Sequence, residues 1–176
     1  MLADSCVLSS SPRSLLVGTL AGASAELVVN TSAMPSSLVA RLAFRLDELN
    51  AGTSSSAHFL TVRCASSDKT ELYAKVEQSG ELGITQSGGP DPSATLVVPR
   101  HAWKHIEMAL TALDAGIGVY AVVVTVDGAL YASFTTVPFA CDAVGLVVEV
   151  GSHVSGGGGT VGDYVLHIDD VTVGWH

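Results

Sequence analysis

Apolar and polar residues alternate along most of the chain with the two-residue period of β-strands. Between Leu38 and Leu46 every second residue is apolar, and Arg41 and Arg45 fall on the opposite positions. Successive side chains of a strand point to opposite faces, so this segment predicts a strand with one buried face. Shorter apolar segments bounded by turn residues predict strands at 59–64, 72–76, 82–85, 103–110, 119–126, 130–134, 144–150 and 164–173.

Turn residues separate these segments. Asp127-Gly128 lies between two predicted strands and indicates a tight hairpin, because both turn positions need positive φ. Turns are also predicted at 79–80 and 113–116, an exposed turn at 88–92 and a glycine loop at 156–159. About ten to twelve strands result, which is too many for one open sheet and typical of a sandwich of two sheets.

The composition favours a single folded domain over residues 1–176. Hydrophobic residues make up 48% of the chain and charged residues only 14%, so there is enough apolar material for a core. Eight Lys and Arg stand against 17 Asp and Glu, giving a net charge of −9. This charge repels phosphate backbones and anionic lipid headgroups, and we expect no nucleic-acid partner.

No apolar run is long enough to span a bilayer. The segment from Ala115 to Val126 is among the longest uncharged runs and stays well below the roughly 18 to 20 residues that a spanning helix needs. We therefore expect no membrane insertion. Residues 13–25 imitate a secretory signal, but Gly18 and Gly22 break the apolar run, and we predict two short strands of the mature domain there.

The three cysteines are Cys6, Cys64 and Cys141. They allow one disulfide with a leftover thiol, or three free thiols, and they show no zinc-type spacing. Cys64 and Cys141 lie in apolar segments, where a buried small hydrophobic residue is the interpretation we favour. The redox compartment is left open.

Four features in fixed order carry a family resemblance. They are the segment Trp103–Met108, the strand 120–126 with its Asp127-Gly128 turn, Val144-Gly145-Leu146, and the closing Ile168–Val173. The series resembles the laminin G-like and concanavalin A-like lectin/glucanase superfamily, strongly over the second half and by strand pattern over the first. The resemblance implies an all-β fold, a two-sheet antiparallel jelly-roll β-sandwich. Members include carbohydrate-binding modules, adhesion domains and glucan hydrolases, so the fold does not choose the function.

The residues argue against catalysis. Retaining glucanases of this superfamily carry acidic residues on alternate positions of one strand, because acid and nucleophile must flank one glycosidic bond. The acidic pairs of this chain are adjacent, as in Asp47-Glu48 and Asp169-Asp170, and adjacent strand residues point to opposite faces. No G-x-S-x-G motif supplies a serine nucleophile either. We predict that the chain is not an enzyme.

Histidines with a suggestive spacing are interpreted as structural. His101 and His105 have the spacing of a helical metal site, but they lie at a predicted strand and lack the glutamate of a zincin. His167 and Asp169 share a strand face, where a hydrogen-bonded pair is the simpler interpretation. We predict no metal and no cofactor.

Calcium binding is the alternative to that prediction. Some lectins of the superfamily bind calcium through loop oxygens, and the scattered loop acids of this chain can supply a few of them: Asp91, Asp114, Asp142 and Asp163. Neither an EF-hand nor a glycine-aspartate repeat occurs.

Aromatic side chains are the candidate sugar-binding groups, because flat rings cover the apolar face of a pyranose. Trp103 lies opposite the apolar face of its strand, and Tyr131 follows the hairpin turn. These two are the candidate ligand-binding residues, although aromatic residues make up only 6% of the chain.

These observations predict a non-catalytic binding or adhesion module of an exported or surface protein, located outside the cell or at its surface. Its expected partner is a glycan or a protein. The alternative is a structural, self-assembling jelly-roll protein, because an apolar surface of low charge can be buried against copies of itself. A glucan hydrolase is the third interpretation.

Overall fold

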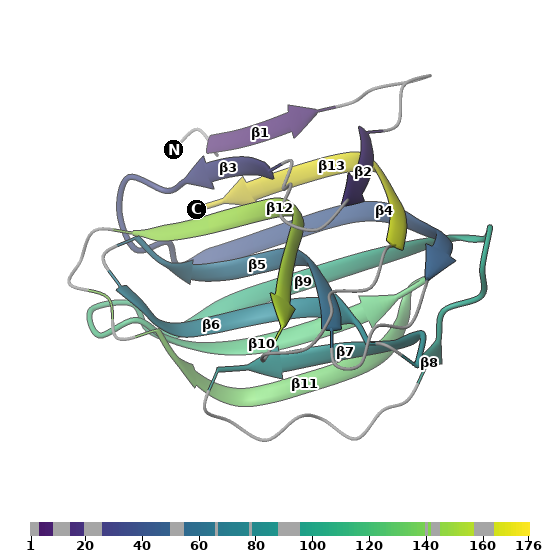
Figure 1. Ribbon diagram of the computed structural model, residues 1–176. Coiled ribbons are helices and arrows are strands. Elements are labelled where there is room, and N and C mark those ends of the chain that lie inside the picture. The colour runs from purple at the N-terminus through teal and green to yellow at the C-terminus, as the bar shows by residue number, and fades with distance from the viewer. Residues whose placement is uncertain are drawn as a thin grey trace.

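The computed structural model of the chain consists of strands and their connections (Figure 1). It describes residues 4–8, 15–19, 26–49, 55–65, 67–77, 79–87, 96–139, 141, 145–156 and 164–176. None of these residues forms a helix that is long and apolar enough to cross a membrane. The described strands are β1 (Asp4–Leu8), β2 (Leu15–Thr19), β3 (Glu26–Asn30), β4 (Ser37–Leu49), β5 (Ser55–Cys64), β6 (Ser67–Val76), β7 (Glu81–Gln86), β8 (Leu96–Val97), β9 (Trp103–Asp114), β10 (Val119–Val126), β11 (Ala129–Pro138), β12 (Leu146–Gly156) and β13 (Tyr164–Trp175).

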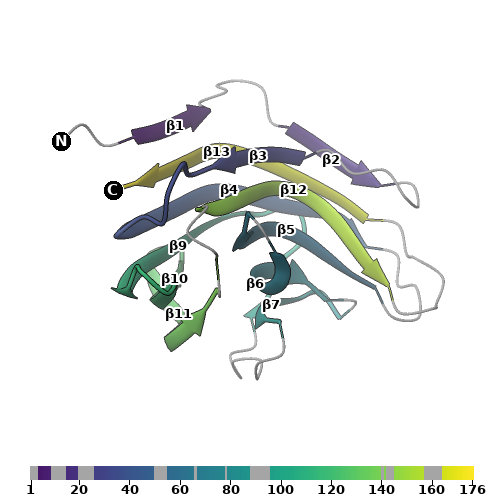
Figure 2. The ribbon, with the colours of Figure 1, turned by 90° about the vertical axis from the view of Figure 1, so that its left-hand side faces the viewer.

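The strands form two antiparallel sheets that lie face to face (Figure 2). The seven-stranded sheet has the order β1-β13-β4-β9-β10-β11, with β2 also paired to β13. The six-stranded sheet has the order β3-β12-β5-β6-β7-β8. Neighbours in space are mostly distant in sequence, as in a jelly roll. The predicted two-sheet antiparallel sandwich is therefore confirmed.

Alternate side chains of both sheets fill the space between them. Phe44 from β4 stacks on Phe59 from β5 with ring centroids 4.6 Å apart, so the two sheets meet through aromatic rings. Tyr120 is fully buried in the same core, and its hydroxyl donates to the carbonyl of Pro35 at 2.7 Å. Burial raises the pKa of Tyr120 to about 12 because the phenolate would lose its hydration.

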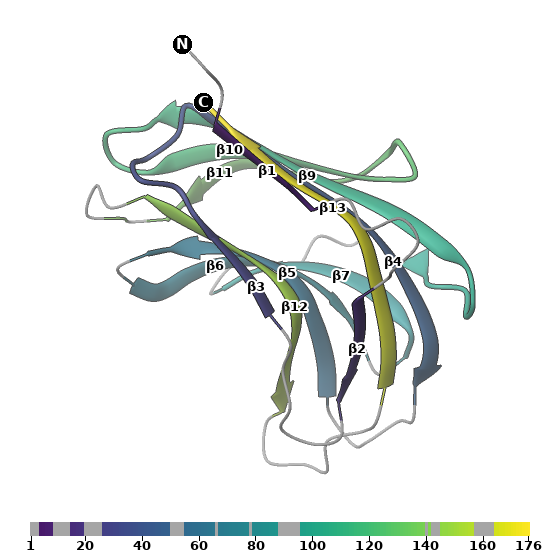
Figure 3. The same ribbon diagram turned by 90° about the horizontal axis from the view of Figure 1, so that it is seen from above.

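Both sheets bend in the same direction, and the six-stranded sheet lies on the inside of the bend (Figure 3). Its register shifts near Phe59 and again between Arg63 and Cys64. Phe59 is an extra residue of β5 relative to β6, and β12 has an irregularity opposite it, between Val150 and His153. Bulges bend strands and increase their twist. The outer face of the six-stranded sheet is therefore concave, and the outer face of the seven-stranded sheet is convex.

The turns agree with the sequence in most places. The hairpin at Asp127-Gly128 is confirmed, with φ of 50° and 78°, and Gly80 adopts a φ of 84° at the turn between β6 and β7. The turn predicted at 113–116 lies two residues later, because β9 continues to Asp114, which pairs with Val119 of β10. The turn at 88–92, the glycines 157–159 and residues 20–25 lie outside the described residues.

A disulfide joins Cys64 at the end of β5 to Cys141, which precedes β12. Of the alternatives that the sequence left open, one disulfide is therefore realised. Both residues are also buried, with exposed fractions of 0% and 7%. The bond closes a loop with a sequence separation of 77 residues, so it removes many conformations from the unfolded chain.

We expect this disulfide to contribute about 2–4 kcal/mol to the free energy of unfolding. Urea denaturation of the wild type with and without reductant measures the contribution. The double variant Cys64→Ser/Cys141→Ser provides the control, because its midpoint should not respond to reductant. An equal midpoint for the wild type in both conditions would show that the two sulfurs are not linked.

Candidate functional site

The concave face carries charged, aromatic and hydroxyl side chains. It is formed by the outward side chains of the six-stranded sheet, which alternate with core residues. Register pairs arrange them in rows, so that Thr61, Tyr73 and Thr85 lie side by side across β5, β6 and β7. The described members of this face include Val28, Asn30, Ser56, His58, Thr61, Arg63, Glu71, Tyr73, Lys75, Glu77, Glu81, Gly83, Thr85, Val97, Val147 and Glu149.

Tyr73 stands at the centre of the concave face and stacks on His58. The two ring centroids are 4.1 Å apart with an interplanar angle of 15°. His58 is 8% exposed, and its Nε2 lies 3.2 Å from the hydroxyl of Ser56. The bulge at Phe59 keeps His58 on the outer face while Phe59 turns into the core. The imidazole therefore holds the phenol ring from one side.

Lys75 lies along the sheet on the other side of this pair. Its Nζ is 5.8 Å from the centre of the Tyr73 ring and 2.6 Å from Oε1 of Glu77. Gly83 on β7 makes this path available, because a Cβ there would meet the side chain of Lys75 at 3.0 Å. The ammonium group thus lies close to the tyrosine and is neutralised by a carboxylate.

Two hydroxyl groups of the central row lack partners among the described residues. The hydroxyl of Tyr73 makes no hydrogen bond there, and neither does Oγ1 of Thr85. Thr85 is only 9% exposed, and a buried hydroxyl without a partner costs stability. Tyr73 and Thr85 are direct cross-strand neighbours, but only the hydroxyl of Tyr73 is accessible to a ligand, because Oγ1 of Thr85 is shielded from solvent.

Arg63 and Glu149 flank this row. Nε and Nη2 of Arg63 both lie 2.5 Å from Oε1 of Glu149, and the two side chains are 24% and 16% exposed. Arg63 follows Thr61 by two residues on the same face, a distance of about 7 Å along a strand. The guanidinium of Arg63 is therefore within reach of a sugar unit bound over Tyr73. Two of its nitrogens already contact the carboxylate of Glu149.

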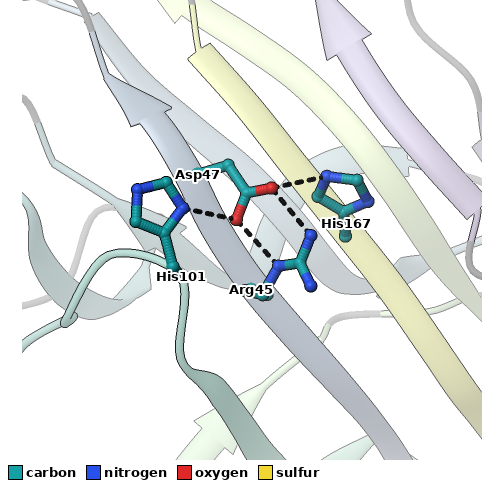
Figure 4. A network of polar contacts seen from close by, with 4 residues as sticks. All are labelled: Arg45, Asp47, His101 and His167. Atoms are coloured by element: carbon teal, nitrogen blue, oxygen red, sulfur yellow. Dashed lines mark hydrogen bonds and ion pairs between the residues drawn. The ribbon is translucent and has the colours of Figure 1, made fainter.

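The convex face carries a separate polar network around Asp47 (Figure 4). Arg45 donates to both carboxylate oxygens of Asp47 at 2.7 Å, and His101 and His167 approach the same carboxylate at 3.3 and 2.9 Å. The hydrogen bonds from Arg45 hold the pKa of Asp47 below its ordinary value, with smaller contributions from the histidines. Both carboxylate oxygens of Asp47 are thus engaged by side chains of the protein, which indicates a structural role.

Farther along the same face, Asp127 holds the start of the β10–β11 hairpin. Its side chain accepts hydrogen bonds from the backbone amide of His105 at 2.9 Å and from Lys104 at 2.7 Å. These two bonds lower the pKa of Asp127, the backbone bond most. A nearby hollow is lined by Arg41 and Glu107, which form an exposed ion pair at 2.5 Å. The acidic groups here are engaged with cations of the same face.

The structure does not bring the two predicted sugar-binding residues together. Trp103 lies on the convex face, 37% exposed, with the guanidinium of Arg45 5.2 Å from its ring centre. Tyr131 lies at the sheet edge, where its hydroxyl donates to the carbonyl of Leu82 in the other sheet. Their role in ligand binding stays a prediction.

The predicted histidine pairs separate as well. His101 faces Asp47, whereas His105 is 3.6 Å from Asp127, so the two do not share a metal site. His167 has a carboxylate partner, but it is Asp47 on the neighbouring strand. Among the described residues no group of three His, Cys, Asp or Glu side chains could hold a metal ion. The predictions on metal, cofactor and calcium remain predictions.

Sequence reasoning missed Tyr73, His58 and Arg63. A signal was present in the segment from Glu71 to Glu77, where Tyr73 and Lys75 occupy the outward positions of an alternating strand. An outward aromatic residue between charged neighbours is a sign of a polar recognition surface. The partners His58 and Arg63 depend on strand order, which the alternation of single segments does not reveal.

Comparison with known proteins relates the fold to carbohydrate-active proteins. No protein-family model matches the chain, and no curated protein matches it. The alginate lyase Aly36B superimposes with a TM-score of 0.61 and 12% identity, covering 91% of this chain and 80% of the lyase. Endo-β-1,4-glucuronan lyase from the fungus Trichoderma reesei gives a TM-score of 0.57 and 16% identity, covering 98% and 87%.

A binding domain of botulinum neurotoxin serotype D/C has the same fold, with a TM-score of 0.60 and 10% identity. The match covers 97% of this chain and 43% of the toxin domain. At these identities the likeness concerns the fold alone. It confirms the jelly-roll sandwich fold that the resemblance implied.

The predictions of a non-catalytic binding or adhesion module and of no enzymatic activity are corrected by these structures. The predictions rested on the missing carboxylate pattern of a retaining glucanase, which excludes one hydrolytic mechanism only. Two of the structures above are polysaccharide lyases, and a lyase cleaves by elimination without an acid and nucleophile pair. The self-assembling protein and the glucan hydrolase find no support among them.

The unpartnered hydroxyl of Thr85 generates a testable prediction. We expect Thr85→Val to raise the free energy of unfolding by about 1 kcal/mol, because valine buries no hydroxyl group that lacks a hydrogen-bond partner. Urea denaturation measures the change. Thr61→Val, in the same row of the sheet, is the matched control and should change stability by less than about 0.5 kcal/mol. A destabilised Thr85→Val would show that the hydroxyl is satisfied in solution.

Proposed function

We propose that this concanavalin A-like jelly-roll protein is a glycan-cleaving enzyme of the lyase type, with its active site on the concave face. The observation that carries the proposal is Tyr73, a phenol without a hydrogen-bond partner among the described residues, stacked on His58 at the centre of that face. The fold shared with an alginate lyase and a glucuronan lyase supports it. The substrate class is a glycan that contains uronic acid units.

Elimination requires one group that takes a proton and returns it. As a phenolate, the oxygen of Tyr73 takes the proton from C5 of the uronic unit, and the electron pair of the C5–H bond forms the C4–C5 double bond. The C4–O glycosidic bond breaks, and the leaving oxygen receives a proton from the same side chain. Tyr73 is the catalytic residue in this scheme. His58 is a positioning residue, because it is nearly buried and acts on the substrate through the tyrosine ring.

The surrounding side chains bind and orient the sugar. The half-buried Thr61, next to Tyr73 on β5, offers a donor and an acceptor to a sugar hydroxyl. Arg63 and Lys75 stabilise negative charge that develops on the carboxyl group as the C5 proton leaves. Both cations lie on strands of a rigid sheet, which preorganises them.

The disulfide supports a location outside the cell. A buried link between Cys64 and Cys141 persists in oxidising compartments and is rare in the cytosol. Extracellular glycans are the substrates that such a protein meets. The glycan partner is further supported by alginate oligosaccharides bound to a mutant of Aly36B and by the gangliosides named for botulinum neurotoxin type C.

Tyr73→Phe tests the proposal, because it removes the hydroxyl and keeps the ring that stacks on His58. We expect kcat to fall by about 10²- to 10⁴-fold, the usual contribution of general acid–base catalysis, with KM changing little. The assay follows the ultraviolet absorbance of the unsaturated product on alginate and on β-1,4-glucuronan. Wild-type activity that persists in Tyr73→Phe would contradict the assignment.

A pair of histidine variants separates positioning from general damage. His58→Gln on the concave face should lower kcat and shift the pH profile of kcat, since the ring that fixes Tyr73 is lost. His105→Gln is the matched control, because His105 is exposed and lies on β9 of the other sheet. Equal effects of the two variants would refute the role of His58.

A further inference from the structure

We infer that the concave face selects glycans of low charge density, in which most uronic carboxyl groups are esterified or separated by neutral sugars. The inference rests on the proposed function and names the substrate class of the same site. It follows from how the charges of this face are paired, and from what elimination requires of a carboxyl group.

The described cations of the concave face already have carboxylate partners within the protein. Arg63 contacts Glu149 at 2.5 Å, and Lys75 contacts Glu77 at 2.6 Å. Three of these four side chains are less than a quarter exposed, so water screens the pairs only in part. A carboxylate of a polyuronate chain that approached Arg63 would also approach Glu149, and that like-charge contact opposes binding.

Carboxylates outnumber cations on the described part of this face. Glu71 and Glu81 add to Glu77 and Glu149, whereas Arg63 and Lys75 are the Lys and Arg residues there whose side chains the structure describes. The chain as a whole has 8 Lys and Arg against 17 Asp and Glu. A surface of this sign repels a chain that carries one negative charge on every sugar unit. It does not repel a chain whose carboxyl groups are esters.

Apolar and neutral groups complete the face. Val28 on β3 is 46% exposed and is the cross-strand neighbour of Glu149. Thr61 and Thr85 lie on either side of Tyr73 in the same row. Ester methyl groups and sugar hydroxyls fit this mixture of apolar and neutral polar surface. Free carboxylates in a regular series would instead need unpaired cations.

The chemistry of elimination agrees with this pairing. Removal of the C5 proton from a free uronate builds a second negative charge beside the carboxylate, so an unpaired cation must neutralise it. An ester carbonyl takes up the same electron pair with a single negative charge. The guanidinium of Arg63, which is already paired with Glu149, is therefore suited to an ester or an isolated acid. The bonds formed and broken are the same in both cases.

The test compares one backbone in two charge states. Alginate and β-1,4-glucuronan are each prepared as the free acid and as the methyl ester, and kcat/KM is measured from the unsaturated product. We expect kcat/KM to be at least about tenfold higher for the ester, since tenfold corresponds to a modest difference in transition-state binding. Binding of the same polymers is measured separately by affinity electrophoresis.

Charge variants locate the origin of the preference. Glu77→Gln removes the carboxylate partner of Lys75 and should lower the ratio of kcat/KM for the ester to kcat/KM for the free acid. Glu149→Gln should lower the same ratio, because it removes the carboxylate partner of Arg63. Glu107→Gln is the matched control, because it removes the same charge from the convex face and should leave the ratio unchanged. Glu77 is the more exposed of the two acidic residues, so its variant keeps the test open if Glu149→Gln fails to fold.

The outcomes distinguish the two proposals. Equal or faster cleavage of the free acid overturns the inference and leaves the lyase intact. Preferential binding of the ester without any product overturns the lyase and retains the charge selection. Preferential binding of the free acid without product, or no binding of either form, overturns both.

Discussion

The bulge at Phe59 is the constraint on which the candidate site depends. It places two consecutive side chains, Phe59 and Leu60, in the core, and so it resets the alternation of β5. Phe59 then meets Phe44 of the other sheet, while His58 remains outside beside Tyr73. β12 is irregular at the same position. The sheet that contains both strands is bent (Figure 3). One extra residue thus couples the packing of the sheets to the curvature of the face and to its central side-chain pair.

The sequence predicts the individual strands well because each strand reports its own burial pattern. Leu38 to Leu46 and the Asp127-Gly128 hairpin are local features, and both appear in the structure where the sequence places them. The contacts of the site are of another kind. Arg63 and Glu149 are separated by 86 residues, and they meet because β12 pairs with β5. Alternation predicts which side chains of a strand are buried. The order of the strands in each sheet depends on the long connections of the jelly roll, which alternation does not reveal.

The absence of a motif from the sequence excludes only the reaction mechanism that needs it. The expectation that Asp169 and Asp170 point to opposite faces is wrong, because the strand is irregular there and both lie outside the core, between the buried Ile168 and Val171. On the concave face, Glu77 and Glu149 lie beside cations. A pair of acid and nucleophile is a requirement of hydrolysis alone. A proton transfer by a tyrosine needs no such pair, and a single phenol on a strand leaves no spacing pattern in the sequence. The residues that carry the proposed reaction are therefore visible only once β5 and β6 are aligned.

The two outer faces differ in how completely their polar groups are satisfied. On the convex face Asp47 accepts two hydrogen bonds from Arg45 and contacts two histidines, so it is bound from every side by the protein itself. On the concave face the hydroxyls of Tyr73 and Thr85 have no partner among the described residues. A polar group whose bonds are all made within the protein gains nothing from a ligand, whereas the accessible hydroxyl of Tyr73 can exchange water for one. This difference in satisfaction, more than the number of charged groups, separates the face that stabilises the fold from the face that is available for chemistry.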